Sequence, residues 1–172
     1  FTGLGDNPHL PRCANPHDPD RVPGGSSSGA AVSVALGQAV VGLGTDTGGS
    51  VRIPASYCGL TGFKPTQRRV SRDGAFVLSP SQDSIGPIAR RVSCCAIADQ
   101  VLAGEPVVPL PDVALAGRRL GVPGDYVMEG LDPDVARAFD LGLSRLSRAG
   151  VSITTFRCPS LGELPDLFAR GT

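Results

Sequence analysis

Residues 24–50 read GGSSSGAAVSVALGQAVVGLGTDTGGS, in which two serine-bearing, glycine-flanked loops enclose a short apolar stretch. The first serine loop is residues 24–29 and the second serine loop is residues 44–50. Several backbone N–H groups stand immediately before Ser50, as the binding of an oxyanion requires, and Ser26 offers a hydroxyl that could relay a proton. The two loops therefore predict one half of a serine-nucleophile acyl-transfer site.

The residues around these loops predict an alternation of helices and strands. A helix over 30–36 and a strand over 39–44 join the two serine loops, and the strand is apolar enough to lie inside a sheet with both faces covered. The other expected elements are a helix over 51–57, a strand over 60–65, a polar loop over 66–87 above the cleft, a helix over 91–103, a strand over 119–123, a helix over 132–149, a strand over 151–156 and the start of a helix at 160–170. This order is typical of an α/β fold with helices on the faces of a sheet.

The composition fits a globular domain that does not bind nucleic acid or a membrane. The 172 residues are 41% hydrophobic and carry a formal net charge of zero, which gives no electrostatic reason to expect a nucleic acid or an acidic membrane as partner. No apolar run approaches the ~20 residues of a membrane span. The five cysteines are odd in number and show no C-x-x-C spacing, which argues against a disulfide framework or a zinc site and for a reducing, cytoplasmic compartment.

Three other interpretations of the serine loops fit the sequence less well. A flexible Gly/Ser linker is a poor interpretation of residues 24–29, because a buried helix and strand follow at once. Residues 25–29 match G-x-S-x-G, but the α/β-hydrolase elbow needs a histidine after it, and His9 and His17 both precede it. A nucleotide-binding loop is excluded because no lysine follows the glycines and Thr47 stands where the dinucleotide fingerprint needs glycine.

The base that would activate a serine is not assigned by the residues themselves. A serine hydroxyl needs a positioned base, and without a downstream histidine the remaining option is a lysine whose pKa is lowered by its surroundings. Lys64 is the one lysine of the sequence. It lies in an expected strand just before Pro65, where a structural role near the end of the sheet is favoured over that of a base.

Three sequence blocks closely resemble the signature of the amidase signature family. They are residues 24–31, 44–55 and 58–66, with similar flanking segments at 3–5, 7–9 and 83–87. The resemblance covers most of residues 1–104 and weakens beyond them. It implies an α/β protein that is part of the amidase signature fold, with a mixed central sheet covered by helices on both faces.

The resemblance implies a Ser–cis-Ser–Lys triad. Ser50 would be the nucleophile that forms the acyl-enzyme, and Ser26 would be the bridging serine, with a cis peptide bond before it. The catalytic lysine of the family lies well upstream of the bridging serine, at a position that this chain starts too late to contain.

The remaining site residues are also implied by the resemblance. The backbone N–H groups of Thr47, Gly48, Gly49 and Ser50 would form the oxyanion hole. The supporting polar residues would be Ser27, Asp46 and Arg52, which brace the loops rather than react.

The resemblance implies an amidase that hydrolyses a carboxamide to a carboxylic acid and ammonia or an amine, without a metal or organic cofactor. The expected partner is a small-molecule amide, with no nucleic acid and no membrane, and a homodimer is left open. Residues 1–172 are expected to be a single partial amidase domain with a signature core at 1–104 and a strand–helix–strand region at 105–172. Sequence is expected to be missing at both ends, and the fragment alone is expected to be inactive.

Two alternatives stay open. The first is the A subunit of the glutamyl-tRNA(Gln) or aspartyl-tRNA(Asn) amidotransferase, which has glutaminase activity. Those proteins commonly carry glutamine where this chain has Ile53, so the sequence favours the simple amidase. The second alternative is a catalytically inert, truncated remnant.

Overall fold

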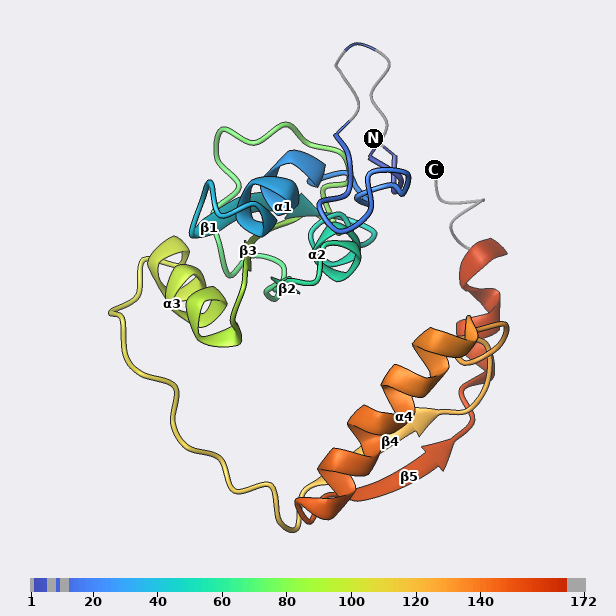
Figure 1. The fold of residues 1–172 in the computed structure, drawn as a ribbon. Helices are drawn as coiled ribbons and strands as arrows, with labels where there is room; N and C mark the ends of the chain where they lie inside the picture. Colours follow the sequence, from blue (N-terminus) through green and yellow to red (C-terminus); the bar gives the residue numbers. More distant parts are fainter. Residues whose placement is uncertain (1, 6–8, 10–12, 167–172) are drawn as a thin grey trace. The chain divides into compact units, whose positions relative to one another are not determined.

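The computed structural model describes residues 2–5, 9 and 13–166 of the chain. Contacts divide the chain into two compact units, unit 1 at Phe1–Leu110 and unit 2 at Pro111–Thr172 (Figure 1). Residues 7 and 8 of the predicted upstream flank lie outside the described residues. That the whole chain is one partial domain stays a prediction.

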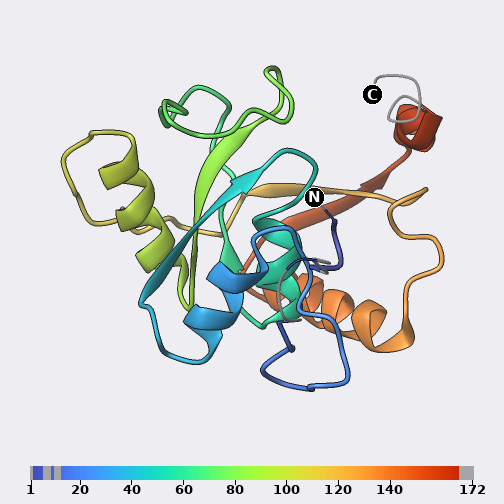
Figure 2. The same ribbon diagram turned by 90° about the horizontal axis from the view of Figure 1, so that it is seen from above.

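Unit 1 is built on a three-stranded antiparallel sheet with strand order β1-β3-β2. The strands are β1 (Val41–Asp46), β2 (Thr61–Gly62) and β3 (Ser84–Ala89), and the helices are α1 (Ser28–Ala35), α2 (Arg52–Tyr57) and α3 (Val92–Leu102). Figures 1 and 2 show α1 and α2 over one face of the sheet and α3 over the other. Unit 1 is therefore an α/β layer arrangement with helices on both faces, as predicted.

Two glycines of β1 let the start of α1 lie directly against the sheet. A Cβ on Gly42 would stand 2.8 Å from the Ala30 carbonyl oxygen, and one on Gly44 would stand 2.6 Å from Ser27 Oγ. Neither position has room for a side chain, so only glycine permits this approach. The close approach brings the first serine loop next to the end of β1, where the second serine loop begins.

The core of unit 1 is a small apolar cluster between the sheet, α1 and α2. Ile88 of β3 is fully buried at its centre. The other buried members are Ala31, Val32, Val51, Ala55 and Cys58. These residues hold the two helices that flank the serine loops, so packing of this cluster fixes the positions of both loops.

Two sequence predictions about the sheet are wrong, and the strand predicted over 60–65 is limited to β2, Thr61–Gly62. In the described chain β1 is an edge strand whose side chains alternate between exposed and buried, so its two faces are not both covered. The polar loop predicted over 66–87 ends at residue 83, because residues 84–89 form β3, the central strand. Gly86 and Pro87 argue against a strand in sequence, but a Cβ at Gly86 would lie 2.1 Å from the Phe63 carbonyl oxygen, so glycine is required there.

Unit 2 is a parallel pair of strands joined through a helix, as the sequence predicts. The elements are β4 (Arg119–Pro123), α4 (Pro133–Arg148), β5 (Ser152–Phe156) and the 3₁₀ helix η1 (Pro159–Glu163). Asp132 caps α4, because its carboxylate accepts the Asp134 N–H at 2.8 Å and proline follows at the first helical position. Residues 167–170 of the last predicted helix lie outside the described residues.

Other expectations concern disulfides, metals and membranes. All five cysteines lie in the described chain and are free thiols. Within residues 2–5, 9 and 13–166, no group of three or more His, Cys, Asp or Glu side chains is arranged to hold a metal ion. No helix in that part of the chain combines the length and apolarity needed to cross a bilayer.

Candidate active site

Ser26 and Ser50 line the same cavity, whose volume is about 390 Å³. Both side chains are half-buried. Thr45 and Thr47 of the second serine loop share the wall, and the rest comes from the residues between Arg68 and Ile85. The two hydroxyls make no hydrogen bond to each other or to another residue of the described chain, so both are available to a ligand in the cavity.

Ser27 fastens the two serine loops to each other. Its N–H donates to the carbonyl of Ser50 at 3.1 Å. Its Oγ accepts the Thr45 N–H at 3.3 Å and donates to the Thr45 carbonyl at 3.4 Å. The Gly25–Ser26 peptide bond is cis, which agrees with the expectation for the bridging serine.

Asp46 organises the second serine loop from the end of β1. Its side chain is fully buried, and its carboxylate accepts the N–H groups of Gly49 at 2.8 Å and Val51 at 3.1 Å. Arg52 donates to the same carboxylate through Nε at 3.0 Å and Nη2 at 2.9 Å. This two-pronged contact and the backbone donors together lock the turn that presents Ser50.

These contacts keep the Asp46 carboxylate ionised. Burial raises the pKa of the Asp46 carboxyl, but the hydrogen bonds from Arg52 and the Val51 N–H, with the charge of Arg52, outweigh burial and lower the pKa below its ordinary value. The negative charge beneath the loop is therefore permanent at neutral pH. Asp46 and Arg52 lie where a bracing role, rather than a reacting one, is expected.

The structure narrows which predicted N–H groups could hold an oxyanion. The N–H of Gly49 already donates to Asp46, so it is not free as an oxyanion donor in this arrangement. The N–H groups of Thr47, Gly48 and Ser50 make no hydrogen bond to another residue of the described chain. Gly49 instead shapes the loop: its φ is 131°, and a Cβ there would lie 2.8 Å from Ile53 Cδ1.

Residues 66–83, which we call the covering loop, are tied to the second serine loop by a residue that sequence reasoning missed. The Asp83 carboxylate accepts the hydroxyl of Thr47. It also accepts the N–H groups of Leu78 at 2.8 Å and Ser79 at 2.9 Å. Next to it, Ser84 Oγ donates to the carbonyl of Asp46 at 2.9 Å.

Asp83 lies in a segment that resembles the family, but the sequence does not indicate which residue its side chain contacts. Residues 83–87 match the resembling family, yet nothing in a linear pattern indicates a contact with Thr47, 36 positions away. Burial raises the pKa of the Asp83 carboxyl, and the hydrogen bonds from Thr47, Ser79 and Leu78 outweigh it, so the net pKa is lowered. Asp83 is thus a second fixed negative charge at the cavity wall.

Lys64 does not line the cavity that contains the two serines. Its Nζ donates to the carbonyl of Pro65 at 2.7 Å, at the end of the β2 region. This contact matches the structural role that the sequence favours for Lys64.

Comparisons with known proteins agree on one family. The family model described as Amidase matches residues 2–171. Over 160 residues the chain is 44% identical to the A subunit of the glutamyl-tRNA(Gln) amidotransferase of Pelobacter propionicus, a match that covers 86% of this chain and 33% of that protein. The chain thus spans about a third of the length of this curated relative.

Solved structures give the same result. One described as the crystal structure of an amidase is 40% identical, with a TM-score of 0.89, and the match covers 99% of this chain and 38% of the other. The A subunit of the glutamyl-tRNA(Gln) amidotransferase of Thermotoga maritima is 35% identical with a TM-score of 0.81, over 88% of this chain and 36% of the other. The predicted amidase signature fold is confirmed.

Proposed function

The chain belongs to the amidase family, and from that premise we propose that its site cleaves the C–N bond of a carboxamide through an acyl-enzyme on Ser50. The observation that carries the proposal is the shared cavity: Ser26 and Ser50 line one pocket beside a loop whose N–H groups are unengaged at Thr47, Gly48 and Ser50. A hydroxyl nucleophile, a second hydroxyl and free amide donors at one place are the parts that acyl transfer needs.

The proposed reaction uses each part once. Ser50 Oγ attacks the amide carbonyl and its proton passes to Ser26 Oγ, while the proton of Ser26 passes to a base. The N–H groups of Thr47, Gly48 and Ser50 hold the negative oxygen. The C–N bond then breaks, the nitrogen takes up a proton and leaves as ammonia or an amine, and water releases the acid from Ser50.

The base in this proposal is the lysine that the family resemblance implies. Lys64 is unsuited to the role, because its ammonium is engaged with the Pro65 carbonyl away from the cavity. We therefore propose that a lysine other than Lys64 serves as the base.

A fluorophosphonate probe tests the nucleophile. In the natural protein that contains this chain, we expect covalent labelling that mass spectrometry maps to Ser50 and that Ser50→Ala abolishes. Ser26→Ala is expected to slow labelling strongly, because the relay is lost. Ser56→Ala is the matched control, since Ser56 is an exposed residue of α2 that does not line the cavity. Equal labelling of the wild type and Ser50→Ala would refute the assignment.

A narrower candidate for the substrate is glutamine. Ile53 alone favoured the simple amidase in the sequence, whereas two relatives, 44% and 35% identical to this chain, are A subunits of the glutamyl-tRNA(Gln) amidotransferase. In this version the ammonia released from glutamine passes to a partner protein. The shared chemistry on Ser50 is the same in both versions.

The two substrates are separated by measuring ammonia release from glutamine and from an uncharged primary amide. Cleavage of glutamine alone favours the amidotransferase version, and efficient cleavage of the uncharged amide favours the simple amidase. Covalent labelling of Ser50 without cleavage of either amide would leave the nucleophile standing and refute both substrates.

A further inference from the structure

Arg68 stands at a turn position that ordinarily belongs to glycine. The Arg69 N–H donates to the Thr66 carbonyl at 3.0 Å and closes a turn with Gln67 and Arg68 at its centre. The φ angle of Arg68 is 79°, which is the value required at the third residue of a type II turn and normally supplied by glycine or asparagine. A left-handed arginine is uncommon, and such residues cluster at functional sites.

The residues on either side of Arg68 are held by their own side chains. The Gln67 amide donates to a backbone carbonyl across the covering loop at 2.9 Å. The Arg69 guanidinium donates to Asp99 at 2.8 Å and to both carboxylate oxygens of Glu105 at 2.8 and 2.6 Å. Because both neighbours are tethered, the turn is fixed, and the Arg68 side chain is left without a partner in the described chain.

Arg68 lines the cavity that contains the two serines, together with three other charged residues. Arg72 is engaged within the covering loop, since it donates to the carbonyls of Pro80 at 2.9 Å and Asp83 at 3.4 Å. The Asp83 carboxylate is occupied by its three donors. The fourth residue, Asp73, makes no side-chain hydrogen bond or ion pair with the described chain.

The cavity wall, as far as the chain is described, therefore offers one unpaired cation, Arg68, and one unpaired anion, Asp73. No ion pair joins these two side chains within residues 13–166. The Arg68 guanidinium has a planar set of N–H donors whose geometry matches a carboxylate. A cavity of about 390 Å³ is large enough for a small organic molecule, and both serines and Arg68 line it.

We propose that Arg68 is the specificity-determining residue of the site and binds a carboxylate of the substrate. The site then takes carboxamides that carry a carboxylate at the end away from the scissile amide. This inference deepens the proposed amidase function and rests on it. Arg68 is an exposed residue that lines the cavity, so its side chain is accessible to a substrate bound there.

The test compares two amides that differ only at the far end. Glutaramate carries a carboxylate where pentanamide carries a methyl group. In the natural protein, Arg68→Gly should lower kcat/KM for glutaramate about ten- to a hundredfold, the loss expected for a hydrogen-bonded charge pair, and leave pentanamide within about twofold. Because glycine suits the turn, the melting temperature should not fall, so a folding defect does not explain the loss.

Two further variants test whether a positive charge at the cavity wall favours the carboxylate substrate. Arg68→Lys should restore part of the glutaramate activity, because it keeps the cation without the planar donors. Asp73→Asn should leave or raise kcat/KM for glutaramate, because it removes a negative charge that repels a carboxylate. A fall for glutaramate with Asp73→Asn would contradict the proposal.

The outcomes separate this inference from the proposed function. The role of Arg68 is overturned if Arg68→Gly lowers kcat/KM equally for both amides, or does not lower it for glutaramate. The proposed function stands in that case, provided that the wild type is labelled at Ser50 and cleaves pentanamide. If the wild type neither reacts with a fluorophosphonate at Ser50 nor cleaves either amide, the proposed function fails and this inference fails with it.

Discussion

Unit 1 buries charged and polar side chains around its loops, whereas unit 2 leaves much of the apolar face of its helix exposed. In unit 1, Asp46 is fully buried and Asp83 nearly so. In unit 2, no residue of α4 is buried, and Val135 and Phe139 on its apolar face are 55% and 40% exposed. The buried apolar residues in the described part of unit 2 are Val122 and Val151, one from β4 and one just before β5.

The helix of unit 2 and the loops of unit 1 are held in place in different ways. In unit 2, local signals mark the start of α4: Asp132 caps the helix, and proline follows at its first position. In unit 1, the serine loops are ordered by side-chain contacts with loop backbone and loop side chains: Asp46 acts within the second serine loop, and Asp83 reaches Thr47, 36 positions away. A site that must keep several groups in place needs such side-chain contacts, and the loss of one of them lowers the stability of the loops.

The largest expected effect is the loss of the Asp46 carboxylate. Asp46→Asn should lower the free energy of unfolding by about 3 kcal/mol, because buried N–H donors and Arg52 lose an ionised acceptor. Hydrogen exchange measured by mass spectrometry on the whole chain should show faster exchange at residues 47–52 and unchanged exchange in α4.

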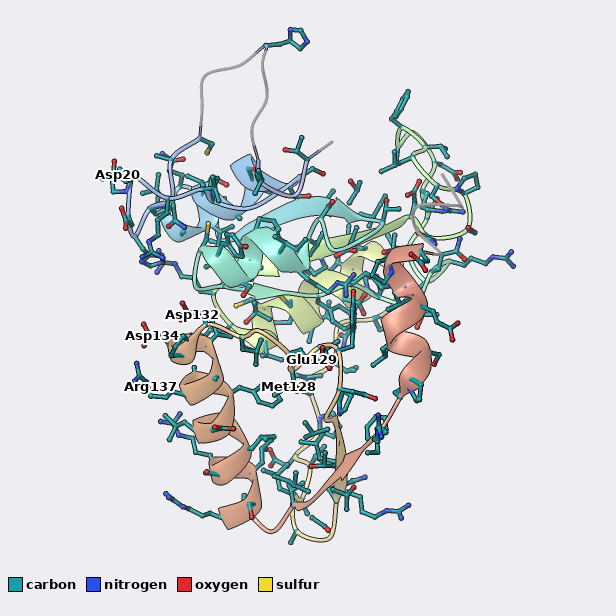
Figure 3. The ribbon with its side chains drawn as sticks, turned by 90° about the vertical axis from the view of Figure 1, so that its right-hand side faces the viewer. Asp20, Met128, Glu129, Asp132, Asp134 and Arg137 are labelled. Atoms are coloured by element: carbon teal, nitrogen blue, oxygen red, sulfur yellow. The ribbon has the colours of Figure 1, made fainter. Side chains whose placement is uncertain are left out.

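Asp20→Asn is the matched control for that variant. Asp20 is an exposed carboxylate on the surface of unit 1, labelled in Figure 3. Its substitution should change the free energy of unfolding by less than about 0.5 kcal/mol. If Asp46→Asn exchanges like Asp20→Asn at residues 47–52, then the buried carboxylate does not order the second serine loop.

The two units also differ in how much of each could be predicted from the sequence. The elements β4, α4 and β5 of unit 2 were predicted to within a few residues, because apolar periodicity, the proline after Asp132 and Gly150 mark α4 locally. In unit 1, Ser26, Ser50 and Asp46 could be found because their motifs are continuous in sequence. Ser26 and Ser50 share a cavity as expected, but their predicted roles in the reaction are still predictions.

The parts that could not be predicted depend on three-dimensional contacts or on backbone angles. β3 was missed because Gly86 and Pro87 read as a loop until the carbonyl of Phe63 is seen to lie against Gly86. The engagement of the Gly49 N–H by Asp46 follows from a turn geometry that no pattern encodes. Arg68 was missed because its φ angle, and not its identity, makes it unusual.

The next largest effect on stability is expected at Gly49, and the adjacent Gly48 serves as its control. A Cβ at Gly49 would lie 2.8 Å from Ile53 Cδ1 on a backbone with φ of 131°, whereas a Cβ at Gly48 would meet no atom within 4 Å. Gly49→Ala should therefore destabilise the chain by about 2 kcal/mol, and Gly48→Ala by less than about 0.5 kcal/mol. Urea unfolding followed by circular dichroism measures both, and equal losses would show that loop conformation is not what selects Gly49.

Lowering the pH should have a smaller effect on the free energy of unfolding, and this effect should begin in unit 1, where Asp46 lies. The pKa of Asp46 is lowered in the folded chain, so its contribution is fully present above the pKa of an unfolded aspartate, about 3.9, and is lost as the pH falls through the folded value. The stability difference between the wild type and Asp46→Asn should therefore shrink below about pH 4. A difference that stays constant down to the acid limit would mean that ionisation of Asp46 does not contribute.

The smallest effect is expected at the start of α4, and it should stay within unit 2. Asp132→Ala removes the acceptor of the Asp134 N–H and should lower stability by about 1 kcal/mol, the usual value of an N-cap. Asp134→Ala is its control: Asp134 and Arg137 form an exposed ion pair one turn apart, seen at the end of α4 in Figure 3, which is worth about 0.5 kcal/mol or less. In Asp132→Ala, exchange should quicken in the first turn of α4 and stay unchanged at residues 47–52. Faster exchange at both places would mean that the order of the serine loops depends on unit 2, and the division between local and long-range order would then fail.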